Sequence, residues 1–180
     1  MPVLLLLSSF AAIPEVVPDL TLAGTDGRNW RLPEVVATHR VTVFEFFSAG
    51  CPVQRAHDPR LVRLASEWEG RGVAIFVVAP EPDGTRAGLA AEARTRGYPF
   101  PILLDPGGRL EKALGVAFCA TAVVADGHGR VRYRGGIDPD GPRLNSRARP
   151  WLRDAVEAVL AGREPNPART QSRGCYLRHW

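Results

Sequence analysis

Short apolar runs alternate along this chain with segments in which apolar residues recur every three or four positions. A run of branched and aromatic residues between turn residues is typical of a buried strand, and a three-to-four spacing is typical of an amphipathic helix. The sequence therefore predicts strands at 41–48, 73–79 and 101–104. It predicts helices at 52–70, 85–96, 108–114 and 150–161.

Two turn sequences predict hairpins on either side of this series. The dipeptide Asp26-Gly27 lies between two short strands within 19–32, and the turn at 126–129 joins strands at 120–125 and 131–133. Strands that alternate with helices and then end in a hairpin indicate an α/β fold. We expect a central mixed β-sheet flanked by helices on both faces, preceded by an N-terminal β-hairpin.

The two ends of the chain depart from this pattern, so the domain is predicted at 17–162. Within residues 1–16, the stretch 2–14 is apolar but too short to span a bilayer, and no Lys or Arg precedes it as in most signal peptides. They are interpreted as an apolar arm or a weak export signal, which leaves both the cytoplasm and the periplasm open. Residues 163–180 have no apolar period and are interpreted as a flexible C-terminal tail that contains Cys175.

Composition excludes several kinds of protein. The net charge is +4, and the basic residues are scattered and not interleaved with aromatic ones, so no nucleic-acid partner is expected. The three cysteines, Cys51, Cys119 and Cys175, are too few and too widely spaced for a disulfide scaffold or a structural zinc site. No cofactor and no bound metal are predicted, and no stable membrane span.

The strongest chemical candidate is Cys51. It follows a predicted strand directly and precedes Pro52 at the start of a predicted helix. A helix N-terminus stabilises a thiolate, and Arg55 lies one turn further along. His57 is more than one turn away and off this face, so it is not expected to act as the base. The alternative is that Cys51 is a small buried hydrophobic residue.

An acidic residue, Glu45, lies in the middle of the same apolar strand. Burial of a carboxyl group raises its pKa toward the range of a useful proton acceptor. The alternative is a carboxylate that faces water at the edge of the sheet.

Several segments together resemble a known group of proteins. FEFFSAGCPV at 44–53 and RGVAIFVVAP at 71–80 are similar to the active-site strand and the next strand of the thioredoxin superfamily. PILLDPGGRLEKALGV, AVVADGHGRVRYRGGID and the tail ARTQSRGCYL resemble its redoxin branch, the alkyl hydroperoxide reductase/thiol-specific antioxidant-like proteins. The resemblance covers roughly residues 17–176 and implies a thioredoxin-like fold with thiol redox chemistry. It implies that Cys51 is the nucleophile, Glu45 the buried acid, and Ser48 the hydroxyl residue three positions before the nucleophile.

The chain departs from the family pattern at three positions. Gln54 stands where a resolving cysteine would complete a CxxC pair, Ala120 stands at the cis-proline position, and Phe44 replaces the proline of peroxidatic sites. The arginine that such peroxidases supply from the strand near Ala120 is also missing.

Two other thiols are candidates to replace the resolving cysteine. In the thioredoxin fold the segment before the cis-proline position packs against the nucleophile, which makes Cys119 a candidate partner of Cys51. A flexible tail would bring Cys175 to the same site. The alternatives are a buried core thiol at Cys119 and a tail cysteine without catalytic duty.

The favoured interpretation is a thiol-based oxidoreductase that acts by thiol–disulfide exchange or peroxide reduction, with a thiol or disulfide protein or a small peroxide as its partner. Two alternatives stay open: a non-catalytic thioredoxin-like binding module and a Cu(I)-handling protein. A soft ion such as Cu(I) suits cysteine ligands, although no ligand spacing in the sequence supports a site. The oligomeric state is not predicted.

Overall fold

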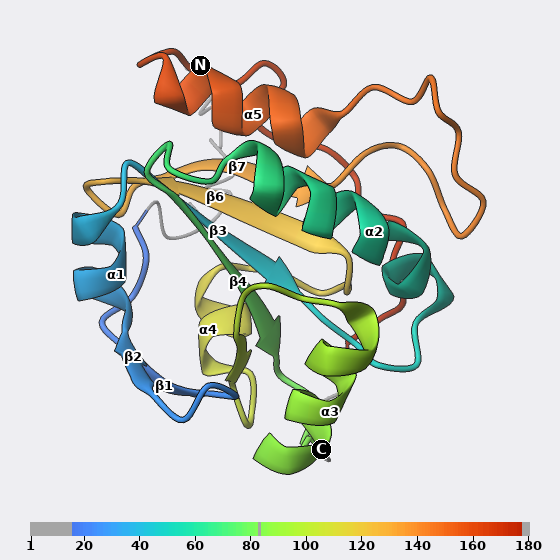
Figure 1. Cartoon of the computed structure of the whole chain (residues 1–180). Helices are drawn as coiled ribbons and strands as arrows, with labels where there is room; N and C mark the ends of the chain where they lie inside the picture. Colours follow the sequence, from blue (N-terminus) through green and yellow to red (C-terminus); the bar gives the residue numbers. More distant parts are fainter. Residues whose placement is uncertain (1–15, 83, 178–180) are drawn as a thin grey trace, which may run out of the picture.

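The computed structural model describes residues 16–82 and 84–177, and its centre is a seven-stranded mixed sheet (Figure 1). The strands are β1 (Thr21–Gly24), β2 (Asn29–Arg31), β3 (Val41–Phe46), β4 (Val73–Ala79), β5 (Ile102–Leu104), β6 (Thr121–Asp126) and β7 (Val131–Gly136). Their order across the sheet is β2-β1-β5-β4-β3-β6-β7. Strands β3, β4 and β5 are parallel, whereas β1, β6 and β7 pair antiparallel with their neighbours.

The helices are α1 (Leu32–Thr38), α2 (Pro52–Glu67), α3 (Arg86–Arg96), α4 (Arg109–Ala113) and α5 (Trp151–Leu160). Local sequence explains several of their ends. Pro52 occupies the first turn of α2, where no amide hydrogen is needed. The Thr85 hydroxyl accepts a hydrogen bond from the Gly88 N–H at the start of α3, and Gly97, with φ 67°, ends that helix in the left-handed conformation.

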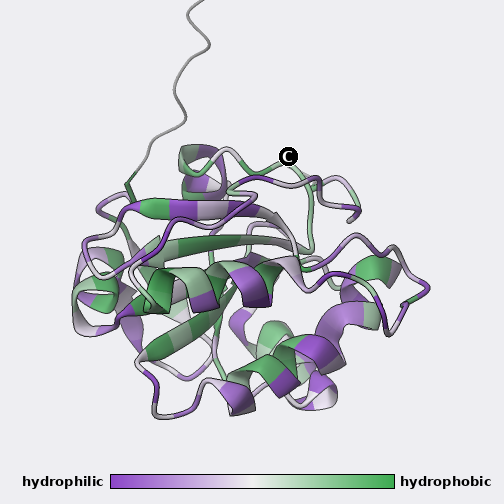
Figure 2. Cartoon of the chain, turned by 90° about the horizontal axis from the view of Figure 1, so that it is seen from above, coloured by the Kyte–Doolittle hydropathy of each residue, from purple (hydrophilic) through white to green (hydrophobic). Residues whose placement is uncertain are grey.

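The helices cover both faces of the sheet and divide its core into two layers. On one face, α2 and α5 bury Leu61, Leu64 and Val156 against the strands. On the other face, α1 and α4 bury Val36 and Leu110. Figure 2 shows hydrophobic and hydrophilic residues side by side on these helices, as expected of helices with one buried face.

The predicted elements are confirmed, and so is the α/β mixed sheet with its N-terminal hairpin. One helix, α1, was not predicted. It has seven residues, about two turns, which is too short to show a clear apolar period. The arm predicted at 1–16 lies outside the described residues except for Val16. None of the helices within 16–82 and 84–177 is long and apolar enough to cross a membrane.

The prediction of a flexible C-terminal tail is wrong for residues 168–177 (red in Figure 1). This segment is held by backbone hydrogen bonds, first to Arg134 of β7 and then to the chain before β6. The Arg134 N–H donates to Ala168 O at 3.0 Å, and the Leu177 N–H donates to Ala117 O at 2.9 Å. Backbone pairing needs no apolar period, so the sequence pattern did not indicate it.

Candidate active site: a cluster of three thiols

Cys51 is the residue at which β3 and its loop turn into α2, as the sequence predicts. Its backbone is extended (φ −80°, ψ 121°), its N–H donates to Ser48 O at 3.2 Å, and its carbonyl accepts the N–H of Arg55 at 3.1 Å as the first bond of the helix. The residue is only 1% exposed. The nucleophile candidate is therefore held at a helix N-terminus but is covered by other parts of the chain.

The covering parts bring the other two cysteines to Cys51. The sulfur atoms of Cys51, Cys119 and Cys175 all lie within 4.8 Å of one another, and all three thiols are free. Cys119 is buried in the chain before β6, whereas Cys175 is exposed on the docked tail. The backbone N–H of Cys175 donates to the Sγ of Cys51 at 3.3 Å and to the Sγ of Cys119 at 3.1 Å.

This cluster favours one thiolate at Cys51. Hydrogen bonds from the Cys119 thiol, and then from the Cys175 thiol and from backbone N–H groups, outweigh burial and lower the pKa of Cys51 to about 5. The same interactions with Cys51 raise the pKa of Cys119 and raise that of Cys175 to about 11. The arrangement is therefore a thiolate that accepts hydrogen bonds from two protonated thiols. The exposed Arg55 is not among its leading partners.

Glu45 is buried in the centre of the sheet, so the alternative of a water-facing carboxylate is wrong. It lies on β3 between Val77 of β4 and Ala122 of β6 and is 0% exposed. Burial, followed by the charge of Asp58, raises the pKa of its carboxyl group well above the ordinary value. Neither oxygen has a hydrogen bond of normal geometry within the described chain, although Gln54 lies close enough to favour the charged form somewhat.

Gln54, which stands at the resolving-cysteine position, connects α2 to the segment that carries Cys119. Its Oε1 accepts the Ala120 N–H at 3.2 Å, and its Nε2 donates to Asp58 Oδ1 at 3.1 Å. Ala120 has φ 53°, a left-handed conformation that is uncommon for a residue with a side chain. Gln54 therefore helps to hold the backbone in an unusual conformation directly after Cys119.

Behind Gln54 lies a buried polar network that the sequence analysis missed. Asp58 accepts hydrogen bonds from the Tyr98 hydroxyl and, at 2.5 Å, from Arg96. Arg96 also donates to Ala49 O at 2.9 Å and lies 4.8 Å from the ring centre of Phe47. Because Ala49 is two residues before Cys51, this network helps to fix the loop that precedes the candidate nucleophile. The sequence signal that could have revealed this network was Asp58, a polar residue on the buried face of a predicted helix.

Two polar side chains near Cys51 in the sequence interact with residues other than Cys51. The Ser48 hydroxyl donates to Glu81 Oε1 at 3.0 Å, which leaves the Ser48 carbonyl as the group that binds Cys51. His57 is buried and its Nε2 lies 3.0 Å from Asp138 Oδ1. His57 is thus directed toward Asp138 and not toward the thiol, as its position on the helix predicts.

The tail is closely fitted to Cys119. The Ser172 hydroxyl lies 3.1 Å from both Cys119 O and Ala120 O, and Leu177 is fully buried. A Cβ atom at Gly174 would lie 1.7 Å from Cys119 O. Only glycine therefore permits this approach. Sequence reasoning singled out Cys175 but not its neighbour Gly174.

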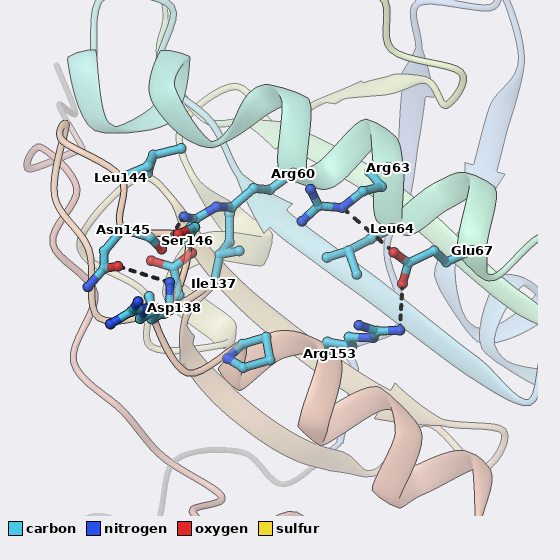
Figure 3. A pocket seen from close by; sticks show the side chains of 13 residues that line it. Arg60, Arg63, Leu64, Glu67, Ile137, Asp138, Leu144, Asn145, Ser146 and Arg153 are labelled. Carbon is cyan, nitrogen blue, oxygen red and sulfur yellow. Dashed lines mark hydrogen bonds and ion pairs between the residues drawn. The ribbon is translucent and has the colours of Figure 1, made fainter.

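A large cleft of the described chain involves none of the three cysteines. It has a volume of about 530 Å³ and lies between α2, α5 and the loop before α5 (Figure 3). Most of its charged side chains pair with one another: Arg60 with Asp138, and both Arg63 and Arg153 with Glu67. The cleft and the thiol cluster are therefore separate features of the molecule.

Comparison with known proteins shows the family to which this chain belongs. The model of the AhpC/TSA family matches residues 13–134, more than half of the chain. The chain belongs to the AhpC/TSA family. The resemblance to the redoxin branch is thereby confirmed. Because the match ends at residue 134, the tail that supplies Cys175 lies outside the segment that defines family membership.

Two curated relatives are similar to this AhpC/TSA member. A "thiol:disulfide interchange protein DsbE homolog" of Paracoccus denitrificans is 29% identical over 125 residues, 69% of this chain and 66% of that protein. "Peroxiredoxin bcp1" of Schizosaccharomyces pombe is 30% identical over 110 residues, 57% of this chain and 51% of that protein. The matches thus span between half and two thirds of the curated relatives.

Solved structures confirm the thioredoxin-like fold. A hypothetical protein of Sinorhizobium meliloti is 26% identical with a TM-score of 0.84, and the match covers 94% of this chain and 95% of that one. A putative thioredoxin from Neisseria meningitidis, 19% identical, has a TM-score of 0.59 over 69% of this chain and 81% of that one. The first match covers nearly the whole chain, and the second shows the fold alone.

Proposed function

We propose that this protein is a thiol-based oxidoreductase in which Cys51 is the nucleophile and Cys119 the resolving thiol. The observation that carries the proposal is the cluster of three free thiols within 4.8 Å, in which the Cys51 pKa alone is lowered, to about 5. A thiolate is the reactive form of cysteine, and Cys51 would be ionised at neutral pH. Membership of the AhpC/TSA family supports the same class of chemistry.

The reaction favoured is thiol–disulfide exchange with a disulfide-bearing protein. The Cys51 thiolate attacks one sulfur of the partner's disulfide, forms a mixed disulfide and releases the other sulfur as a thiolate. The Cys119 thiol then loses its proton and attacks the Cys51 sulfur, which releases the second thiolate and leaves a Cys51–Cys119 disulfide. The partner is reduced by two electrons, and this pair of cysteines is oxidised by two.

Two observations favour this reaction over peroxide reduction. The leading partners of the Cys51 thiolate are thiols and backbone N–H groups, and no arginine is among them. In addition, residues 175–177 of the tail pair with residues 117–119 through backbone hydrogen bonds. The two segments form an antiparallel β-bridge at Phe118 and Tyr176. An extended segment of a partner protein would be able to use the same backbone groups once the tail moves away.

Glu45 is proposed as the proton acceptor for Cys119 in the second step. The carboxyl group is buried, its charge acts on both Cys51 and Cys119, and its pKa is raised. A proton acceptor works best when its pKa lies near the operating pH, and burial raises the pKa of Glu45 in that direction. Cys175 is proposed as a stabilising donor to Cys51 and as the thiol that covers it.

Mass-spectrometric mapping of the oxidised protein tests the assignment. The reduced protein is treated with oxidised glutathione, blocked, and digested without reduction. We expect a Cys51–Cys119 disulfide in the wild type, a persistent Cys51–glutathione adduct in Cys119→Ser, and no glutathione incorporation at the cluster in Cys51→Ser. A wild-type protein that incorporates no glutathione and forms no disulfide would instead select the non-catalytic binding module.

A further inference from the structure

We infer that the thiols of Cys51, Cys119 and Cys175 form a binding site for one Cu(I) ion in a three-sulfur coordination. The inference goes beyond the proposed redox function, because it requires the docked tail as a ligand and needs no turnover. The three ligands come from the start of α2, the chain before β6 and the C-terminal tail, which only the fold brings together.

The spacing of the sulfurs is close to what a metal ion requires. Three sulfurs at about 2.3 Å from a central ion in a plane lie about 4.0 Å from one another. The three sulfurs of this protein lie within 4.8 Å of one another. They would therefore have to approach by less than about 1 Å.

The ligand set selects a soft ion with low coordination number. Thiolates favour Cu(I) and zinc over hard ions such as magnesium and calcium. Zinc in structural sites takes four ligands, whereas no fourth histidine, cysteine or carboxylate joins the three sulfurs in the described chain. Three sulfurs without a fourth donor therefore suit Cu(I) better than zinc.

The backbone already holds the three ligands in place. The tail is fixed on one side of Cys175 by Ser172 and on the other by the buried Leu177. The Cys175 N–H donates to two of the three sulfurs, which stabilises negative charge on them. Cys51 and Cys119 are buried, while Cys175 is exposed and provides the route by which an ion enters from solvent.

Charge and electrons balance in the binding reaction. The three cysteines bind one Cu(I) as thiolates and release the protons of any thiols to solvent, which leaves three thiolates around the ion with a total charge of −2. No electron is transferred, because copper stays in the reduced state and no disulfide forms.

Anaerobic competition with a Cu(I) chelator of known affinity tests the site, using the full-length reduced protein. The wild type is expected to bind one Cu(I) and show three sulfur ligands by X-ray absorption spectroscopy. Loss of a partner beyond the ligands commonly costs about 10–100-fold in metal affinity, so loss of a ligand in Cys175→Ser should cost at least about 100-fold. Zn(II) is expected to compete poorly with Cu(I).

A matched pair of glycine variants separates the docked tail from a general effect on the fold. Gly174→Ala, which places a Cβ 1.7 Å from Cys119 O, should weaken Cu(I) binding while all three thiols remain. Gly141→Ala, which meets no atom within 4 Å, should bind as the wild type does. A two-sulfur shell in the wild type, or unchanged affinity in Cys175→Ser, would overturn the inference. Neither outcome affects the glutathione experiment, which contains no metal.

Discussion

The backbone N–H of Cys175 donates a hydrogen bond to the Sγ of Cys51 at 3.3 Å, although the two residues lie 124 positions apart. One contact thus has two effects. It stabilises the Cys51 thiolate, and it places the tail over a residue that is 1% exposed. If Cys51 is the nucleophile, as proposed above, the tail must move before a large partner reaches it.

The thiol that ionises in the acidic pH range should be that of Cys51. We expect the ultraviolet thiolate absorbance of the wild type to rise with a midpoint near pH 5. Because the first cause of the low pKa is the hydrogen bond from the Cys119 thiol, Cys119→Ala should move this midpoint upward. Cys51→Ser should remove it. A transition that persists in Cys51→Ser would assign the thiolate to another residue.

Gly174→Ala should release the tail from the domain. The added Cβ would collide with the Cys119 carbonyl, and a backbone carbonyl in a fitted segment has little room to move. We expect faster amide exchange at residues 172–177, faster alkylation of Cys51 and a higher Cys51 pKa. Hydrogen-exchange mass spectrometry and thiol labelling measure these changes.

The control for this experiment is Gly141→Ala, since no atom lies within 4 Å of a Cβ there. It should leave tail exchange and Cys51 labelling unchanged. Equal protection of the tail in Gly174→Ala and the wild type would mean that the tail does not depend on this close approach.

Removal of the Gln54 amide should destabilise the fold. In Gln54→Leu, Asp58 keeps its bonds from Tyr98 and Arg96, and the Ala120 N–H keeps its bond to Phe46 O, so two buried hydrogen bonds are lost but no group is left without a partner. A hydrogen bond contributes about 0.5–1.5 kcal/mol net, so we expect a decrease of about 1–3 kcal/mol in the free energy of unfolding. Urea denaturation measures it.

Arg55→Ala is the matched control for Gln54→Leu, because Arg55 is the next residue on α2 and is exposed. Exposed substitutions usually change stability by less than about 0.5 kcal/mol. Equal stability of both variants would show that the Gln54 bridge contributes nothing to the fold.

Glu45→Gln should stabilise the protein at neutral and alkaline pH. The folded pKa of Glu45 is raised above the unfolded value, so the native state favours the protonated form. The wild type therefore loses stability as pH rises from the unfolded pKa to the folded pKa, by about 1.4 kcal/mol per pH unit in that window. Glutamine cannot ionise, so the variant does not lose stability as the pH rises through this window.

Unfolding free energies of Glu45→Gln and the wild type should agree at about pH 4 and diverge by about pH 8. The exposed Glu69→Gln should show no such divergence. In glutathione turnover, Glu45→Gln should slow disulfide formation between Cys51 and Cys119 and flatten its pH dependence, which a purely structural role would not do. A constant stability difference at both pH values would contradict a raised pKa.

Much of the fold was predictable because its signals are local. The buried run of β4 and the helix boundary at Thr85 and Gly97 follow from apolar period, capping and left-handed glycine geometry within a few residues. The position of Cys51 follows from the same logic, since a strand, a proline and a helix are consecutive in the sequence. The sequence left undecided whether the Glu45 side chain is buried, and its position between β4 and β6 decided this.

The sequence by itself therefore determined the order of the strands and of every helix except α1, and it determined the thiol at the start of α2. Only the tertiary structure decided that Cys119 and Cys175 meet at that thiol. The reason is physical: the tail is held by backbone hydrogen bonds and by the absence of a side chain at Gly174, and neither leaves a periodic pattern. The hydrogen bond between Gln54 and Ala120 was also not predictable from the sequence, because the two residues are 66 positions apart.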